Sequence, residues 1–198
     1  MGLKIHLLGP RTLIKEGRVI RPHSAKVVAL LAYLILEADR HHSREKLATL
    51  LWGESLDTRA RASLRQGLYS LRQTLGNVAD ACLELEEGAV VFNLHQDLWV
   101  DVLELRTLAA LDTTDVDRLR RAAQLYQGAL LEGLMLPDSP TFEEWLFFRR
   151  DTLEQQALQT LYTLVEQLIR QGTPQEALPF AQRLVTLWNH SMKGLTST

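Results

Sequence analysis

Cysteine is almost absent from this chain of 198 residues, in which Cys82 is the one cysteine. An intrachain disulfide is therefore impossible, as is usual for proteins of a reducing compartment. Long apolar runs are absent too, because no stretch approaches the roughly 18 apolar residues of a membrane span. Lys4 and His6 interrupt the apolar N-terminus, so the uninterrupted core of a secretory signal is missing. We expect a cytoplasmic protein.

Sequence motifs for catalysis, cofactors and metals are also missing. There is no glycine-rich phosphate loop and no nucleophile elbow around a serine. The adjacent residues His41 and His42 would rarely chelate a metal from one face, and no cysteine or carboxylate pair lies nearby at zinc spacing, so we expect both in a solvated connector. Cys82 is expected to pack in the core rather than to react. The sequence thus predicts no enzyme, no cofactor and no metal.

Charge is divided unevenly along the chain, whose formal net charge is −2. Residues 1–98 contain 13 Lys or Arg and 11 Asp or Glu, whereas residues 99–198 contain 9 and 13. The first half is therefore slightly basic and the second is acidic. This small asymmetry directs any polyanionic partner to the first half.

The first half shows strand periodicity at both ends and helix periodicity in the middle. Apolar and polar residues alternate from Leu3 to Leu7, and the Lys15–Gly17 segment is typical of a hairpin loop. This order predicts an α+β fold, a winged helix-turn-helix with an N-terminal β-sheet and a C-terminal wing hairpin. The predicted elements are strands over residues 3–7, 12–14 and 18–20, helices over 25–38, 44–52 and 58–75 with Ser24 and Ser43 capping the first two, and a hairpin with strands over 83–86 and 90–94.

The second half has only helical periodicity beyond an expected boundary at residues 95–101. The Gly172-Thr173-Pro174 break predicts two antiparallel helices whose facing sides are small and apolar, like a tetratricopeptide-type pair in an all-α domain. No clean repeat of about 34 residues is visible. The predicted helices span residues 102–111, 116–131, 142–171 and 174–188, and the predicted domains are 1–98 and 99–190, followed by a disordered tail at 191–198.

The third predicted helix carries the functional signal. From Thr58 to Leu75 it contains four arginines and no acidic residue, and its leucines recur on one face. Amide and guanidinium groups on the opposite face could read base edges, while flanking cations and hydroxyls could hold phosphates. We therefore predict binding to double-stranded DNA, with base reading by Arg59, Gln66 and Tyr69 and phosphate contacts by Arg61, Ser63, Arg65, Arg72, Arg44 and Lys46.

Other interpretations of the same residues stay open. A basic helix can be a solvated surface, in which case a degenerate winged helix would serve as a protein-interaction module. In the second half, Trp145, Phe147 and Phe148 are either core residues at helical spacing or part of a partner or self-association surface.

The motifs of the whole chain resemble the SARP/AfsR-type bacterial regulators, which join an OmpR/PhoB-like winged helix to a bacterial transcriptional activation domain. The strongest match is RARASLRQGLYSLRQTLG at Arg59–Gly76, which is similar to the family's recognition helix. The resemblance implies binding to promoter repeats, often as a dimer or higher assembly, recruitment of RNA polymerase and a nucleoid-associated location. The other matching segments are Leu7–Pro10 with Gly17, Lys26–Glu37, Ser43–Glu54, Val100–Val102, Leu125–Gly133 and Phe142–Leu153.

Overall fold

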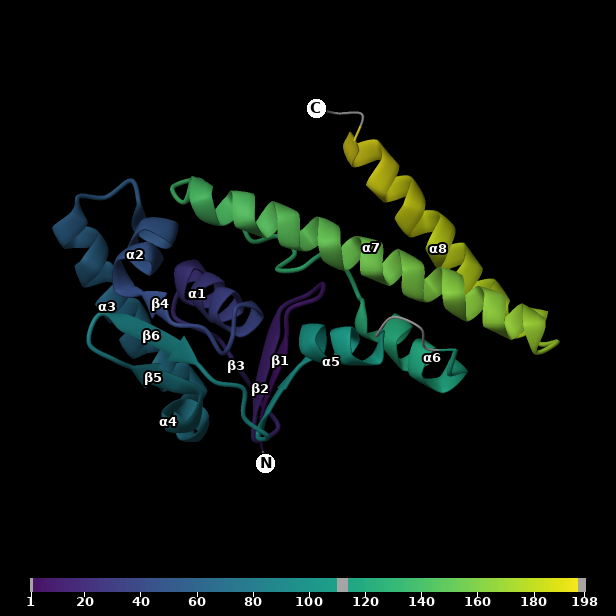
Figure 1. The fold of residues 1–198 in the computed structure, drawn as a ribbon, viewed down its shortest axis with the longest axis horizontal. Helices are drawn as coiled ribbons and strands as arrows, with labels where there is room; N and C mark the ends of the chain where they lie inside the picture. The colour runs from purple at the N-terminus through teal and green to yellow at the C-terminus, as the bar shows by residue number, and fades with distance from the viewer. Residues whose placement is uncertain (1, 110–113, 196–198) are drawn as a thin grey trace.

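Short strands and helices alternate up to Val100, and the described residues beyond it are mainly helical (Figure 1). The computed structural model describes residues 2–109 and 114–195. The strands are β1 (Leu3–His6), β2 (Thr12–Lys15), β3 (Arg18–Ile20), β4 (His42–Ser43), β5 (Leu83–Leu85), β6 (Ala89–Phe92) and β7 (Leu98–Val100). The helices are α1 (Ala25–Leu36), α2 (Arg44–Trp52), α3 (Asp57–Leu75), α4 (Ala79–Cys82), α5 (Asp101–Leu108), α6 (Val116–Leu125), α7 (Pro140–Arg170) and α8 (Pro174–Leu195), with a 3₁₀ turn, η1 (Gly76–Val78).

The mixed α/β character predicted for the first half is confirmed, and the structure adds β4, η1, α4 and β7 to the predicted elements. Ser24 caps α1 by accepting a hydrogen bond from the N–H of Val27 at 3.3 Å, and Ser43 caps α2 through the N–H of Lys46 at 3.1 Å. Each side chain satisfies one of the N–H groups that a helix start leaves without a partner. These caps are local in sequence, which is why the starts of both helices were predictable.

Two small sheets frame α1–α3. The first has the strand order β3-β2-β1-β7 and the second β4-β6-β5. Strand β7 is parallel to β1, with Leu3 opposite Leu98, although the sequence predicted no strand there. Three residues are too few to show the alternation of apolar and polar side chains that marks a strand. They form a strand because they pair with β1, which lies far away in the sequence.

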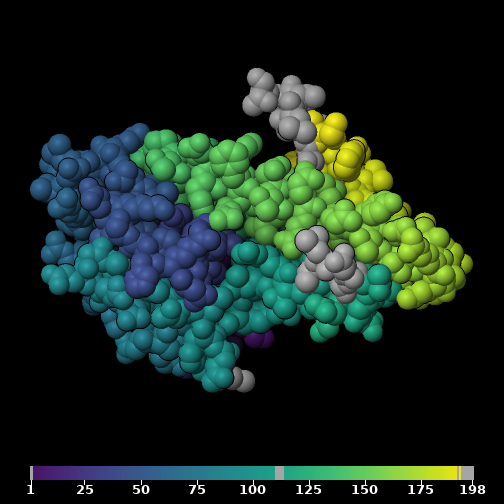
Figure 2. All heavy atoms as spheres, viewed as in Figure 1, coloured from purple at the N-terminus to yellow at the C-terminus, as the bar shows by residue number. Residues whose placement is uncertain are grey.

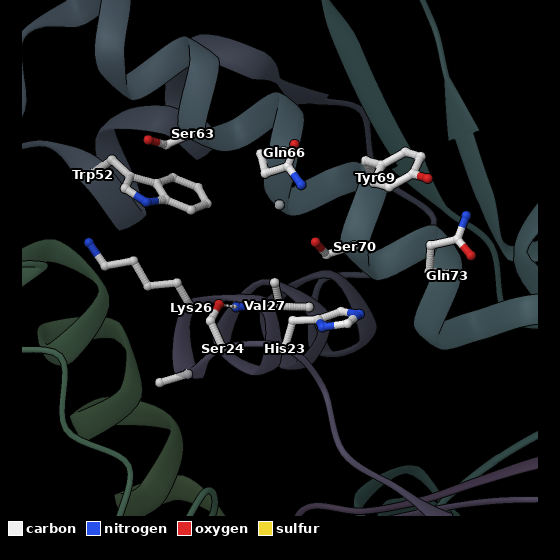
Figure 3. A pocket seen from close by; sticks show the side chains of 12 residues that line it. His23, Ser24, Lys26, Val27, Trp52, Ser63, Gln66, Tyr69, Ser70 and Gln73 are labelled. Carbon is white, nitrogen blue, oxygen red and sulfur yellow. Dashed lines mark hydrogen bonds between the residues drawn. The ribbon is translucent and has the colours of Figure 1, made fainter.

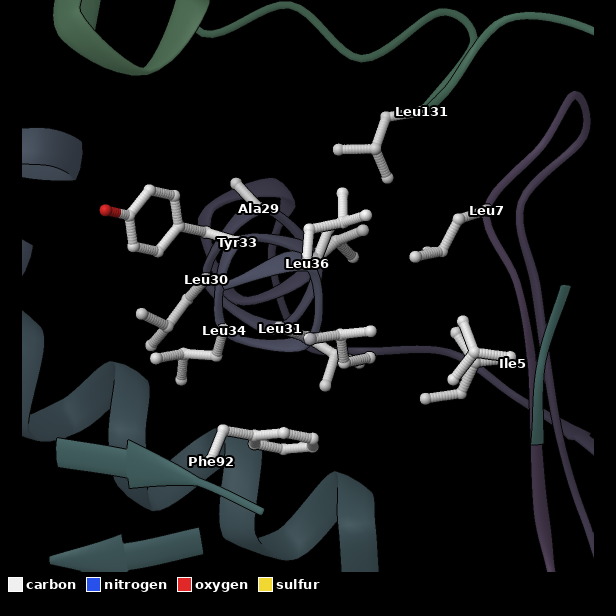
Figure 4. Close-up of a cluster of buried hydrophobic side chains, with 14 of the residues drawn as sticks. Ile5, Leu7, Ala29, Leu30, Leu31, Tyr33, Leu34, Leu36, Phe92 and Leu131 are labelled. Carbon is white, nitrogen blue, oxygen red and sulfur yellow. The ribbon is translucent and has the colours of Figure 1, made fainter. Parts of the chain in front are cut away.

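Helix α1 is the centre of the core. Every residue from Val27 to Leu36 is buried, as expected of a helix that is apolar on all sides. Side chains from β1, β6 and the segment before α7 surround it, among them Ile5, Phe92 and Leu131 (Figure 4). The same core cluster continues into α5 and α7, so the two halves share buried surface and form one continuous body (Figure 2).

Two buried carboxylates join the halves. Asp101 accepts hydrogen bonds from the N–H groups of Leu7 and Leu8 at 2.9 and 3.0 Å, and burial raises its pKa although these bonds lower it. Glu37, at the end of α1, accepts from Nε1 of Trp145 at 3.1 Å and pairs with Arg149 of α7. Burial raises the pKa of Glu37, but the bonds from Trp145 and Arg149 outweigh it and lower the pKa overall.

The prediction of a helix from residue 116 to residue 131 is wrong at its end. Helix α6 stops at Leu125, and Leu131 has a φ of 51°. The chain leaves the helix because Leu130 forms a β-bridge with Leu8 and the N–H of Leu131 donates to the carbonyl of Leu7 at 2.8 Å. Tertiary pairing to the end of β1 thus overrides local helical periodicity.

The predicted tail at 191–198 is also wrong for its first residues, because α8 runs on to Leu195. Residues 196–198 and the predicted helix end at Leu111 lie outside the described residues. Helices α7 and α8 form the expected antiparallel hairpin, and α6 packs against both in a second cluster that contains Leu119, Leu161 and Ala177.

Candidate nucleic-acid interface

Helix α3 is held by its apolar face and leaves the opposite face outside. Its buried residues include Leu64, Leu68 and Leu71, and it packs mainly against α1 and α2. The helix ends where Gly76 takes a φ of 63°, a left-handed conformation that glycine adopts without strain. The order of a short α2, a connector over residues 53–56 and a long α3 places one fixed helix face toward solvent.

The residues predicted to read bases lie on this outward face. Arg59 and Gln66 are exposed, and Tyr69 is 60% exposed although it is aromatic. Arg61 and Arg65 are exposed as well. The long helix α7 passes over α1 and α2 rather than over this face (Figure 1). The helical half therefore leaves the outward face of α3 uncovered.

The remaining predicted phosphate contacts differ in how free their side chains are. Lys46 is exposed, and Ser63 is half-buried. Arg72 forms an ion pair with Asp80 of α4. Arg44 is half-buried under the β5–β6 hairpin, where its Nη2 lies 3.5 Å from the carbonyl oxygen of Glu86. A DNA phosphate would thus have to compete with a protein acceptor at Arg72 and at Arg44.

A groove that the sequence did not reveal runs between α3 and the start of α1 (Figure 3). It has a volume of about 700 Å³, and Gln66 and Tyr69 form part of its wall. Trp52 closes one side, where an ideal Cβ on Gly67 would lie 3.0 Å from the ring, so glycine allows the ring to sit against α3. His23, Ser24 and Lys26 supply the opposite wall. The Ser24 cap marked this helix start in the sequence, but nothing local showed that it faces α3.

The β5–β6 hairpin, at the position of the predicted wing, is acidic. Glu84 and Glu87 are exposed and Glu86 is half-buried, whereas residues 83–92 contain no lysine or arginine. The Glu86 carboxylate lies 3.0 Å from Nδ1 of the exposed His41. Acidic side chains repel phosphate, so the hairpin does not extend the candidate interface on α3.

His41 and His42 lie in different environments, one exposed and the other buried. The prediction of a solvated connector is wrong for His42, which is buried because β4 pairs with β6 and draws it inward. Its Nε2 lies 3.0 Å from the carbonyl oxygen of Glu37, and its ring packs on Tyr33 with a centroid distance of 5.4 Å. Within residues 2–109 and 114–195, no group of three His, Cys, Asp or Glu side chains could hold a metal ion.

Cys82 is fully buried, as predicted for a packing residue. Burial raises the pKa of its thiol, and the negative charge of Asp97 raises it further. A raised pKa keeps the thiol protonated near neutral pH, which is the unreactive form.

The three aromatic residues singled out in the second half lie in two environments, the core and the surface. Trp145 packs in the core, with its ring 5.0 Å from that of Tyr33. Phe147 and Phe148 are 67% and 60% exposed. Their rings contact each other edge-to-face, with centroids 5.7 Å apart. Core packing therefore explains Trp145, whereas the two phenylalanines are left on the surface of α7.

Comparison with known proteins finds a family and a curated relative that the chain is similar to. Residues 103–191 match the family described as the bacterial transcriptional activator domain. The regulatory protein AfsR of Streptomyces coelicolor is 30% identical over 183 residues, which make up 89% of this chain and 18% of that protein. The chain thus spans less than a fifth of the length of this curated relative.

A solved structure shares the fold. Mycobacterium tuberculosis EmbR, described in complex with a low-affinity phosphopeptide, aligns with a TM-score of 0.57 at 18% sequence identity. The alignment covers 93% of this chain and 59% of the EmbR chain. Across the part of the chain that the structure describes, no helix is long and apolar enough to cross a membrane.

A mixed α/β half followed by a bacterial transcriptional activator domain defines a class of bacterial regulator. The match to AfsR confirms the resemblance that the sequence motifs predicted, and EmbR shares the fold. In its motifs, its activator-domain match and its similarity to AfsR, the chain resembles the SARP/AfsR type of bacterial transcriptional regulators.

Proposed function

We propose that the chain is a sequence-specific regulator, most simply an activator, whose first half is a winged helix-turn-helix that binds double-stranded DNA. Helix α3 enters the major groove, where Arg59, Gln66 and Tyr69 meet base edges. The proposal rests above all on one observation: the face opposite the α3 leucines is exposed, rich in arginine and free of acidic residues from Thr58 to Leu75.

Physical fit supports this placement. An α-helix with its side chains is about 10–12 Å wide, and the major groove of B-DNA is about 12 Å wide. Arg61, Arg65 and Arg72 follow one another on one flank of α3, so they face one of the two phosphate backbones that border the groove. Lys46, in the first turn of α2, adds a cation where the positive end of the helix dipole also favours phosphate.

The acidic β5–β6 hairpin is not expected to contact DNA. In many winged helices the hairpin after the third helix reaches a neighbouring groove, but Glu84 and Glu87 oppose such contact here. We therefore assign the duplex contacts to α3 and its neighbours and not to β5–β6. A DNA-binding role of this kind would place the chain on the nucleoid.

The helical half is proposed to serve self-association or contact with RNA polymerase at promoter repeats, as the resemblance implies. Phe147 and Phe148 support this role, because two large apolar side chains in mutual contact on a surface are typical of interaction sites. Residues 1–98 and 99–190 remain the proposed functional domains, although they share one core.

Selection of bound duplexes from a random pool tests the function directly, because it asks both whether the chain binds and what it reads. We expect enrichment of one short motif, repeated if the chain assembles on DNA. A mobility shift with unselected duplex at low salt supplies the control. If neither experiment detected binding, the winged helix would be a protein-interaction module instead.

A further inference from the structure

The groove between α3 and the start of α1 has the properties of an anion site. The residues that line it include no Asp or Glu. The N–H groups of Ala25 and Lys26 open toward the helix start and have no hydrogen-bond partner among the described residues. These N–H groups and the dipole of the twelve-residue helix α1 favour a negative charge at this end.

A serine on the opposite wall, largely buried itself, presents its hydroxyl to the groove and points to a ligand independently. Ser70 is only 8% exposed, and its hydroxyl has no hydrogen-bond partner among the described residues. Figure 3 shows the oxygen directed into the space between α3 and the start of α1. The hydroxyl makes no hydrogen bond within the described residues and is therefore free to donate to an anion bound in the groove.

Lys26 supplies the charge at the edge of the same groove. Its ammonium lies 5.6 Å from the centre of the Trp52 ring and 2.7 Å from the Asp138 carboxylate, in the segment before α7. The lysine side chain is only 18% exposed, so the ring and Asp138 hold it close to the groove. The Lys26 bond to Asp138 lowers the pKa of that carboxyl.

The position of the groove relative to α3 indicates which anion fits. A helix in the major groove is bordered by a phosphate backbone on each side. Arg61, Arg65 and Arg72 lie on one flank of α3, whereas Ser63 and Ser70 lie on the other, which faces the start of α1. A duplex whose base edges reach Gln66 and Tyr69 would therefore bring its second backbone over this groove.

We infer that the groove binds a single phosphodiester of the duplex strand opposite to the one held by the arginines. The N–H groups of Ala25 and Lys26 and the Ser70 hydroxyl donate to its oxygens, and the Lys26 ammonium neutralises it in place of Asp138. This inference rests on the proposed DNA binding. It adds a second anchor, so that α3 is held from both sides and cannot rotate in the groove.

The test measures the affinity of the full chain for one selected duplex across a series of salt concentrations. Lys26→Gln should reduce the magnitude of the log–log salt slope by about 0.9, the value for one lost phosphate contact. Ser70→Ala should leave that slope unchanged but weaken binding roughly tenfold, because it removes a hydrogen bond to a charged group. Asp138→Asn should strengthen binding, because it releases Lys26.

Two controls separate a local site from general effects. Lys4→Gln removes an exposed lysine on β1 and should leave both slope and affinity unchanged. In the second control, duplexes carry a neutral methylphosphonate at one position at a time. At one position on the strand opposite to the arginine contacts, neutralisation should weaken the unsubstituted chain and abolish the effect of Lys26→Gln. This arm distinguishes a duplex phosphodiester from a free phosphate ion, and its measurement on the unsubstituted chain needs no variant to fold.

The outcomes separate the two proposals. If the unsubstituted chain bound no duplex, the DNA-binding function would fail and the groove site with it. If Arg65→Ala changed the salt slope but Lys26→Gln, Ser70→Ala and every methylphosphonate on the opposite strand had no effect, the function would stand and the groove site would be wrong. Equal weakening by Lys26→Gln on all duplexes, neutralised or not, would also overturn it.

Discussion

At the scale of single residues, the outward face of α3 brings together side chains with different tasks. Gln66 is uncharged, exposed and located in the middle of the face, where a helix in the major groove comes nearest to the base pairs. The arginines beside it carry the charge that any phosphate backbone attracts. Substitutions at the two kinds of position should therefore produce different signatures, one in sequence preference and the other in salt dependence.

Replacing Gln66 with Ala should relax the preference at one base pair of the selected motif and leave the salt slope unchanged. An amide that bonds a base edge in two places contributes about 1–3 kcal/mol of discrimination. Repeating the duplex selection with the variant measures this change. If the motif stayed the same at every position, Gln66 would not read a base.

Arg72 is partly neutralised in the free protein by Asp80, whose side chain is 85% exposed. Asp80→Asn should strengthen binding to any duplex by a few-fold, because exposed ion pairs are worth about 0–1 kcal/mol and a negative charge beside the DNA is removed. Mobility shifts with unselected duplex give the comparison. In the Arg72→Ala background the gain should shrink, and an undiminished gain there would show that Asp80 does not act through Arg72.

At the scale of elements, one carboxylate adds polar contacts to the apolar packing between α1 and α7. Glu37 lies at the end of α1 and binds Trp145 and Arg149 of α7, so it links the core of the first half to the helical half. Its lowered pKa means that the folded state favours the charged form. This contribution to stability is present above the ordinary pKa of 4.5 and is lost as the pH falls through the lowered value.

Glu37→Gln should lower the free energy of unfolding near neutral pH by about 1–3 kcal/mol, the range for a lost hydrogen bond to a charged group. The difference from the unsubstituted chain should shrink as the pH falls below 4.5. Urea unfolding at several pH values measures it. Arg40→Gln is the matched control, because Arg40 pairs with the same carboxylate but is 71% exposed, and its effect should be small. A Glu37→Gln effect independent of pH would contradict the assigned charge state.

At the scale of the whole molecule, the surface of the helical half determines whether copies of the chain associate. The exposed pair Phe147 and Phe148 is the candidate contact. Light scattering over a range of concentrations should show self-association of the unsubstituted chain, and the double substitution Phe147→Ser with Phe148→Ser should abolish it. A strictly monomeric unsubstituted chain at high concentration would remove self-association from the role of this pair.

Features of the fold that depend on local signals were predictable from the sequence, whereas features that depend on long-range pairing were not. Helices α1–α3 were predictable because the serine caps of α1 and α2, the apolar periodicity of the helices and the glycine at residue 76 are local signals. Strand β7 and the end of α6 were not, since both depend on pairing with the region around β1. The exposed face of α3 followed from its periodicity, whereas the groove beside it requires the start of α1 to meet α3 in space.

The central claim, that the arginine side of α3 lies against a duplex, is tested most directly by the salt dependence of binding for Arg65→Ala. The account predicts weaker binding to all duplexes alike and a log–log salt slope smaller in magnitude by about 0.9, with the fold unchanged because Arg65 is exposed. An unchanged slope and affinity in a properly folded variant would contradict it.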